Sequence, residues 1–181
     1  MLYRKEVILK DGTPCLIRSA GEADARAAYD NFMLTHEETD NLLSYPDENS
    51  LTVEGEGQFL AKREASETAV ELCAIAEGRL IGLAGIEPIG EKDKVKHRAG
   101  FGIAVERACW GKGVGRQLTL SCIECARKAG YLQVELEAVS DNAAALRLYE
   151  KCGFREYGRN PKGFRTRDGR WQELVLMRLE L

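Results

Sequence analysis

Residues 106–117, with the sequence ERACWGKGVGRQ, separate a strand-like segment from a helix-like one. In the preceding residues 99–105, Phe101, Ile103 and Val105 recur with a period of two, which is typical of a half-buried strand. In the following segment, apolar residues recur on one face of a long helix: Val114, Leu118, Cys122, Cys125 and Ala129. The quoted stretch is therefore expected to join a central strand to a long helix.

Gly111, Gly113 and Gly115 alternate along this connection, and Lys112 lies between the first two. Glycines allow the backbone to pass close to a ligand. The first N–H groups of a helix lack partners inside the helix, and the helix dipole makes them attractive to anions. The pattern predicts a pyrophosphate site, although a tight turn without a ligand explains a lone glycine triplet equally well.

The length of 181 residues suits one domain, which we expect to span residues 1–181. The net charge of −3 argues against general nucleic-acid binding, which requires a basic surface. No segment approaches the roughly 20 apolar residues that cross a bilayer, and the first residues do not resemble a signal peptide. We therefore expect a cytoplasmic protein that binds neither nucleic acid nor a membrane.

The cysteines are scattered through apolar patterns, so we expect them to be reduced and mostly buried: Cys15, Cys73, Cys109, Cys122, Cys125 and Cys152. Cys122 and Cys125 have CxxC spacing, but no second pair of ligands follows at zinc spacing, and no metal site is predicted. Cys109, beside the glycine loop, is expected to be a buried thiol rather than a nucleophile.

The hydrophobic pattern of the whole chain predicts an α/β fold with a mixed sheet. Hairpins are expected at residues 6–18, 69–88 and 154–181, and a further strand at residues 131–139. Helix starts are expected at Ser19 or Gly21, at Val53, after the glycine loop, and at Ser140 or Asp141, with Asn142 as a further candidate cap for the last helix. In the helix that begins at Val53, Phe59 and Leu60 are expected to face inward.

Residues 35–57 carry seven acidic side chains and no Lys or Arg. Such a run is typical of a solvated loop and of helix N-termini. It is also compatible with an acidic wall that attracts a cationic substrate.

Three segments together resemble the GNAT superfamily of N-acetyltransferases: the loop of residues 110–115 (WGKGVG), the strand LEAVSDN and the helix NAAALRLYEKCGF. The similarity covers residues 72–181 and is strongest over residues 102–154. The acyl-CoA signature of the family is Arg/Gln-x-x-Gly-x-Gly/Ala, so Trp110 departs from it at the first position. In having Trp at this position, the chain resembles the branches of the family that contain ribosomal-protein and antibiotic N-acetyltransferases.

The resemblance implies a single GNAT-type domain with a mixed, mostly antiparallel twisted sheet of about seven strands, flanked by helices. The strands of residues 102–105 and 133–139 would splay apart and form the slot for acetyl-CoA, the implied co-substrate. Its pyrophosphate would bind the backbone amides of the glycine loop, and its pantetheine arm would pair with the strand ending at Val105. The implied cofactor-binding residues are Ile103, Val105, Trp110, Gly111, Lys112, Gly113, Val114, Gly115, Arg116 and Asn142.

The resemblance further implies that a primary amine attacks the thioester directly in a ternary complex. Tyr149 matches the general acid of the family, and Glu137 matches the general base of some relatives. An alkylammonium is almost unreactive at neutral pH, so a base is needed. Glu87, Glu106 and His97 are the alternatives for this base. A backbone N–H near Val105 is expected to stabilise the oxyanion.

The acceptor is expected to be a small-molecule or peptide amine, and its identity stays open, as does the assembly, for which relatives suggest a homodimer. One alternative function is a catalytically inactive acyl-CoA-binding sensor or scaffold with the same fold. Another is a nucleotide-binding enzyme, although the loop lacks the Lys-Ser/Thr ending of a P-loop.

Overall fold

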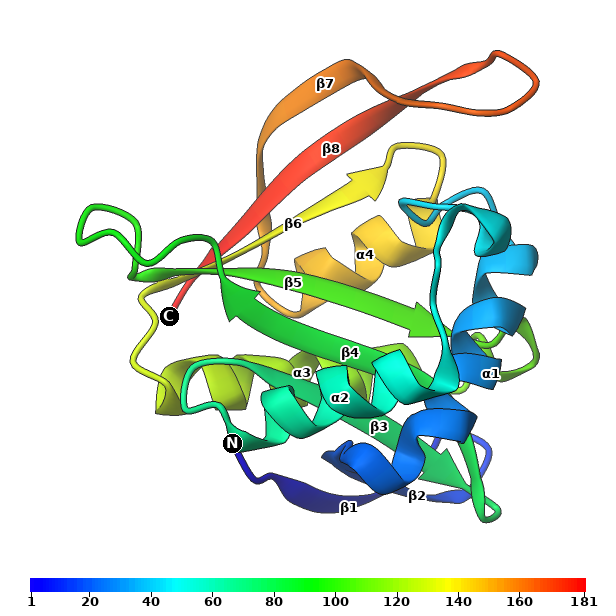
Figure 1. Ribbon diagram of the computed structural model, residues 1–181. Coiled ribbons are helices and arrows are strands. Elements are labelled where there is room, and N and C mark those ends of the chain that lie inside the picture. The colour runs from blue at the N-terminus through cyan, green and yellow to red at the C-terminus, as the bar shows by residue number, and fades with distance from the viewer.

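The eight strands of the computed structural model, which describes residues 1–181, form one open sheet (Figure 1). The strands are β1 (Arg4–Ile8), β2 (Pro14–Ser19), β3 (Val70–Ala76), β4 (Arg79–Pro88), β5 (Arg98–Val105), β6 (Gln133–Val139), β7 (Arg155–Arg165) and β8 (Trp171–Glu180). Their spatial order is β1-β2-β3-β4-β5-β6-β8-β7, and only β5 and β6 pair in parallel. The predicted mixed, mostly antiparallel sheet is confirmed. It has one strand more than the seven or so expected, because the terminal hairpins both join it, one at each edge.

Four α-helices flank the sheet: α1 (Ala25–Glu37), α2 (Val53–Ala65), α3 (Val114–Lys128) and α4 (Ala143–Lys151). Consecutive residues of β3 show which helices share a face, because neighbouring side chains in a strand point in opposite directions. Leu72 belongs to the large core that includes Leu118 of α3, whereas Cys73 packs with Leu60 of α2. Helices α1 and α2 therefore cover one face and α3 the other, as Figure 1 shows.

The three predicted hairpins are confirmed, as are the central strand, the long helix and the strand after it. The prediction for Phe59 was wrong, because 39% of this residue is exposed and the Arg63 guanidinium lies 4.8 Å from its ring centre. The prediction for Leu60 is confirmed, because this residue is fully buried, and the other buried residues of α2 are Glu56 and Gly57.

Of the three candidate caps for α4, the structure uses the last one. Its N-cap is Asn142, whose Oδ1 accepts a hydrogen bond from the Ala145 N–H at 3.2 Å, rather than Ser140 or Asp141. The Ser140 N–H donates to the Glu173 carbonyl at 2.9 Å and so continues the β6–β8 ladder. The chain therefore leaves the sheet later than the capping pattern alone suggested. At the first helix, Gly21 is followed by a short 3-10 turn (Glu22–Asp24) before α1 begins.

All six cysteines are free thiols, and only Cys152 is not fully buried. Burial raises the pKa of the Cys109 thiol, which keeps it protonated at neutral pH. No helix has the length and apolar character that a membrane crossing requires.

Candidate active site

Strands β5 and β6 separate in the middle of the sheet. They pair only from Arg98↔Gln133 to Gly100↔Glu135, although β5 continues to Val105 and β6 to Val139. Within this short paired segment, the Arg98 guanidinium of β5 binds the Glu135 carboxylate of β6, with Nη2 2.7 Å from Oε2. This contact lowers the pKa of Glu135. The predicted splay is confirmed, and an ion pair holds its closed end together.

Backbone N–H groups of β5 point into this opening. The Arg98 carbonyl accepts from the Ile89 N–H, and the Glu106 N–H donates to the Ile81 carbonyl, so both groups face β4. Backbone direction alternates along a strand. The N–H groups of Ile103 and Val105 consequently face the opposite way, where β6 has moved off. The family resemblance implies that the pantetheine arm pairs with this end of β5, and the oxyanion is expected near the Val105 N–H.

The glycine loop presents an unbroken row of backbone donors. None of the six N–H groups of residues 111–116 has a hydrogen-bond acceptor in the protein, and Gln117 is the first residue of α3 that has one, the Gly113 carbonyl at 3.1 Å. Gly111 and Gly113 have φ values of +77° and +98°, which other residues rarely adopt. A row of free amides at a helix N-terminus is suited to an anion such as a pyrophosphate.

Gly115 is required for a different reason. A side chain there would begin 3.2 Å from Leu148 Cδ1, so its absence allows α4 to pack closely against the start of α3. This contact brings the residues of α4 next to the loop.

Two polar side chains of the loop have partners in the protein. Lys112 Nζ lies 3.4 Å from Asp11 Oδ2, so the β1–β2 turn shares its positive charge. Trp110 is half exposed, and its indole Nε1 donates to the Val105 carbonyl at 2.7 Å. The residue that departs from the family signature thus caps the end of β5.

Tyr149 lies on α4, on the α3 side of the sheet. Its ring contacts Phe101 of β5 edge-on, with centroids 6.1 Å apart, and Phe154, with centroids 6.0 Å apart. The residue is 8% exposed, and its hydroxyl makes no hydrogen bond within the protein. Burial raises the pKa of the phenol, so Tyr149 stays protonated at neutral pH and can donate a proton.

The four candidate bases have different surroundings. Glu137 is exposed on β6 beyond the separation point and has no cationic partner. Glu87 is paired with Arg63, with Oε2 2.5 Å from Nη2. Glu106 is 4% exposed and is held by Arg79 and Asn31. His97 precedes β5 and lies about 26 Å along the strand from Val105, at roughly 3.3 Å per residue.

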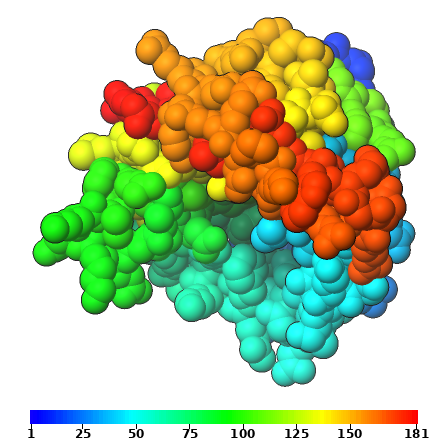
Figure 2. All heavy atoms as spheres, turned by 90° about the horizontal axis from the view of Figure 1, so that it is seen from above, coloured from blue at the N-terminus to red at the C-terminus, as the bar shows by residue number.

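A hollow lies on the α1–α2 side of this separation (Figure 2). It is framed by the β7–β8 hairpin in orange to red, the connection after β4 in green, and the segment from α1 to α2 in cyan to teal. On β5, Gly102 faces this side, and a Cβ there would meet no atom within 4 Å. The backbone of β5 is therefore uncovered at Gly102 on this face of the sheet.

The acidic segment of residues 35–57 is partly neutralised by arginines that the sequence pattern did not connect with it. Arg167 Nη2 lies 2.5 Å from Asp47 Oδ1, and Arg170 Nη2 lies 3.6 Å from Asp40 Oδ2. Both arginines follow β7, at the tip of the terminal hairpin. Asp40 and Asp47 thus contact this hairpin, whereas the five glutamates of the segment have no ion pair.

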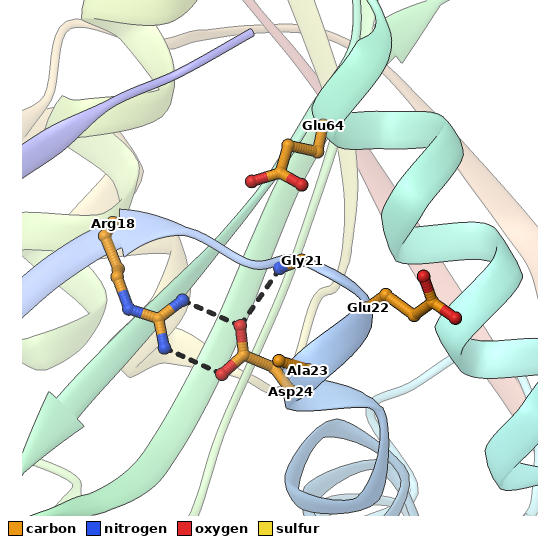
Figure 3. Close-up of a pocket in the computed structure, with 6 residues that line it drawn as sticks. All are labelled: Arg18, Gly21, Glu22, Ala23, Asp24 and Glu64. Carbon is orange, nitrogen blue, oxygen red and sulfur yellow. Dashed lines mark hydrogen bonds and ion pairs between the residues drawn. The ribbon is translucent and has the colours of Figure 1, made fainter.

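A separate pocket lies beside the end of β2 (Figure 3). Its lining is Arg18, Gly21, Glu22, Ala23, Asp24 and Glu64. The Arg18 guanidinium makes two bonds of 2.7 Å to the Asp24 carboxylate, which also accepts from the Gly21 N–H. Arg18, Asp24 and the Gly21 N–H therefore make their hydrogen bonds with one another. In the sheet, β3 and β4 lie between this pocket and β5. The pocket therefore belongs to the packing of α1 rather than to the active site.

Comparison with known proteins agrees with this geometry. The acetyltransferase (GNAT) family model matches residues 27–154. N-alpha-acetyltransferase RimI of Mycobacterium tuberculosis is 35% identical over 89 residues, which cover 49% of this chain and 54% of that protein. Across the curated relatives that it matches, the chain spans between 18% and 60% of their length.

Two solved structures share the fold. An acetyltransferase of the GNAT family from Streptococcus pneumoniae has a TM-score of 0.88 and 28% identity, covering 92% of this chain and 99% of that chain. The protein yncA from Salmonella typhimurium, solved with acetyl-CoA, has a TM-score of 0.82 and 24% identity, covering 92% and 94%.

Proposed function

The chain belongs to the GNAT family of acetyltransferases, and we propose that it transfers an acetyl group from acetyl-CoA to a primary amine by direct attack in a ternary complex. The observation that carries the proposal is the alignment of three features around one opening. These are the free amides of residues 111–116, the splayed strands β5 and β6, and Tyr149, whose ring contacts Phe101 of β5 and whose hydroxyl has no partner in the protein.

The donor side of the site fits acetyl-CoA, which the yncA structure holds. The amides of the glycine loop would bind the pyrophosphate, with Lys112 and Arg116 adding positive charge. The N–H groups of Ile103 and Val105 would hold the pantetheine arm and the oxyanion as an added strand does. Asn142 uses its Oδ1 to cap α4, which leaves its Nδ2 available to the same arm.

The side chains then divide the proton transfers between the two faces of the sheet. Glu137 would take a proton from the acceptor ammonium, because it is exposed beyond the separation point and has no cation of its own. The freed amine attacks the thioester carbonyl, a C–N bond forms and the C–S bond breaks. Tyr149 would protonate the departing thiolate from the opposite face, and the second proton that leaves the acceptor nitrogen as the amide forms would return to the Tyr149 phenolate through solvent.

Release of free thiol from acetyl-CoA, measured against a panel of primary amines, tests the proposal. We expect thiol release that depends on the added amine, with an N-acetylated product detected by mass spectrometry. Tight acetyl-CoA binding without amine-dependent release from any member of the panel would contradict it.

A further inference from the structure

Lys10 is an exposed cation that the glycine-loop signature does not include. It lies in the turn between β1 and β2, and its ammonium makes no ion pair or hydrogen bond with the protein. The neighbouring Asp11 is the only carboxylate of this turn, and it is paired with Lys112 instead. The charge of Lys10 is therefore free to bind a ligand.

The backbone holds this turn against the glycine loop. The Lys10 N–H donates to the Lys112 carbonyl at 2.9 Å, which joins two segments that are distant in the chain. Within the turn, the Leu9 N–H donates to the Thr13 carbonyl at 2.9 Å, and Asp11 Oδ1 accepts from the Thr13 N–H at 3.1 Å. Leu9 itself is 5% exposed and belongs to the large core. Buried and hydrogen-bonded neighbours thus fix the position of Lys10 beside the loop.

The side chain of Lys10 runs alongside Gly113. A Cβ at Gly113 would lie 3.5 Å from Cγ, 3.9 Å from Cδ and 3.8 Å from Cε of Lys10. Three successive carbons at similar distances show that the lysine stem passes along the glycine rather than turning away from it. The ammonium is one bond of roughly 1.5 Å further on, so it lies within about 5 Å of this Cβ position. It is therefore next to the row of free amides of residues 111–116.

The other cations of the loop leave this side without a free positive charge. Lys112 shares its charge with Asp11, whose Oδ2 lies 3.4 Å from Nζ. Arg116 has no ion pair. Burial raises the pKa of the Cys152 thiol and the nearby Arg116 lowers it, which places Arg116 close to the end of α4. The amides of the loop thus have one free cation on the α4 side, Arg116, and one on the β1–β2 side, Lys10.

We propose that the Lys10 ammonium binds the pyrophosphate of acetyl-CoA, so that the β1–β2 turn is part of the cofactor site. The inference rests on the proposed function, because that function places the pyrophosphate on the amides of the loop. A lysine ammonium is a point charge on a flexible stem and is well suited to phosphate oxygens. Asp11 opposes this binding, since its carboxylate neutralises Lys112 and repels an anion at the same place.

Calorimetric titration of CoA into the protein and into Lys10→Met tests this contact without turnover. Methionine retains most of the apolar stem against Gly113 and removes the charge. The dissociation constant should rise by roughly three- to ten-fold at low salt, and the difference should shrink as salt is added, because an exposed ion pair is screened. Equal affinities of the two proteins at low salt would overturn the proposal.

Lys5→Met is the matched control, because it removes the same charge from the same hairpin. Lys5 Nζ lies 2.6 Å from Glu124 Oε1. Glu124 is in the C-terminal half of α3, roughly 15 Å along the helix from its start at about 1.5 Å per residue. CoA affinity should therefore stay near its original value in this variant. An equal loss in Lys5→Met would show a general charge effect and refute the specific contact.

Asp11→Asn should act in the opposite direction. Asparagine keeps Oδ1, the acceptor for the Thr13 N–H, and removes the negative charge. CoA affinity should increase by about two- to five-fold, because Lys112 is released and the repulsion is lost. A loss of affinity in both Asp11→Asn and Lys10→Met would attribute both effects to a distorted turn and reject the ion pair.

Dephospho-CoA, which lacks the 3′-phosphate but keeps the pyrophosphate, identifies the group that Lys10 contacts. Lys10→Met should weaken its binding by the same factor as that of CoA. An effect seen with CoA alone would move Lys10 to the 3′-phosphate and overturn the assignment.

These titrations need no acceptor amine, so their result is independent of acetyl transfer. A loss of affinity in Lys10→Met with the expected controls would support the contact even if no amine is acetylated. Amine-dependent thiol release together with equal CoA affinities would keep the proposed function and reject the Lys10 contact.

Discussion

The indole Nε1 of Trp110 donates a hydrogen bond to the carbonyl oxygen of Val105 across 2.7 Å. This bond joins the first residue of the glycine-loop signature to the last residue of β5. The bond gives the Val105 carbonyl a partner where β6 no longer pairs with β5. It also holds the end of β5 in place beside the free N–H of Val105. A side chain that departs from the family signature therefore supports the same site in another way.

Trp110→Phe keeps the aromatic surface but removes this donor. We expect acetyl-CoA affinity to fall by roughly three- to ten-fold, because a net hydrogen bond contributes about 0.5–1.5 kcal/mol. Titration calorimetry with acetyl-CoA measures the change. Trp171→Phe is the matched control, since Trp171 is also half exposed but lies on β8. Equal losses in both variants would argue against a specific role for the Trp110 bond.

Gly113→Ala tests the row of free amides. Gly113 and Gly130 both have positive φ, +98° and +82°, so alanine should destabilise the fold at either position by about 1–2 kcal/mol. Only Gly113 lies in the loop that would bind the pyrophosphate. Acetyl-CoA affinity should therefore fall in Gly113→Ala and stay near its original value in Gly130→Ala. Similar affinities in the two variants would remove the loop from the binding site.

Tyr149→Phe removes the proposed acid. We expect kcat to fall by about 10²–10⁴-fold, the usual contribution of a general acid, with acetyl-CoA affinity little changed. Stability should also change little, because the hydroxyl makes no hydrogen bond in the protein. Tyr131→Phe is the opposite control: its hydroxyl donates to the Thr68 carbonyl at 2.9 Å, so stability should fall while kcat is kept. An unchanged kcat in Tyr149→Phe would exclude it from the mechanism.

Glu137→Gln should lower kcat by about 10²-fold or more and remove the acidic limb of the pH–rate profile, because the amide cannot accept the ammonium proton. Steady-state rates between pH 6 and pH 9 measure both effects. Glu87→Gln serves as the comparison, since its carboxylate is already bound to Arg63. Should the acidic limb persist in Glu137→Gln and vanish in Glu87→Gln, the base would be Glu87.

Burial raises the pKa of Glu71, on β3, to about 8, and this shift predicts how stability depends on pH. The folded protein keeps this proton up to about pH 8, whereas the ordinary value of 4.5 applies to the unfolded chain. Between these values the folded state binds more protons, so the free energy of unfolding should decrease as pH rises from about 4.5 to 8. Urea unfolding at pH 5 and pH 8.5 measures this decrease. It should be smaller in Glu71→Gln, and an identical pH dependence would contradict the assignment.

Much of the fold follows from local patterns. The turn at Asp11 and Gly12, the period-two strand before the glycine loop and the apolar face of α3 all lie in short windows, and all three are confirmed. The predictions that missed concern residues whose positions depend on contacts with distant parts of the chain. Phe59 lies outward because Leu60 fills the space against α1, and α4 begins late because Ser140 still pairs with β8.

The candidate site divides in the same way. The glycine loop could be recognised because its six amides are consecutive in the chain. The neutralisation of Asp40 and Asp47 could not, because their partners Arg170 and Arg167 lie more than a hundred residues away. A sequence pattern carries no information about which distant charges meet.

The sequence by itself determined the donor side: a strand, a loop of alternating glycines and a helix, whose geometry depends on neighbouring residues. Only the tertiary structure decided which residues of distant strands share a face of the sheet. Glu71, Gly85 and Gly102 lie on the same face because three strands pair in one register, and a shift of one residue would turn each to the other face.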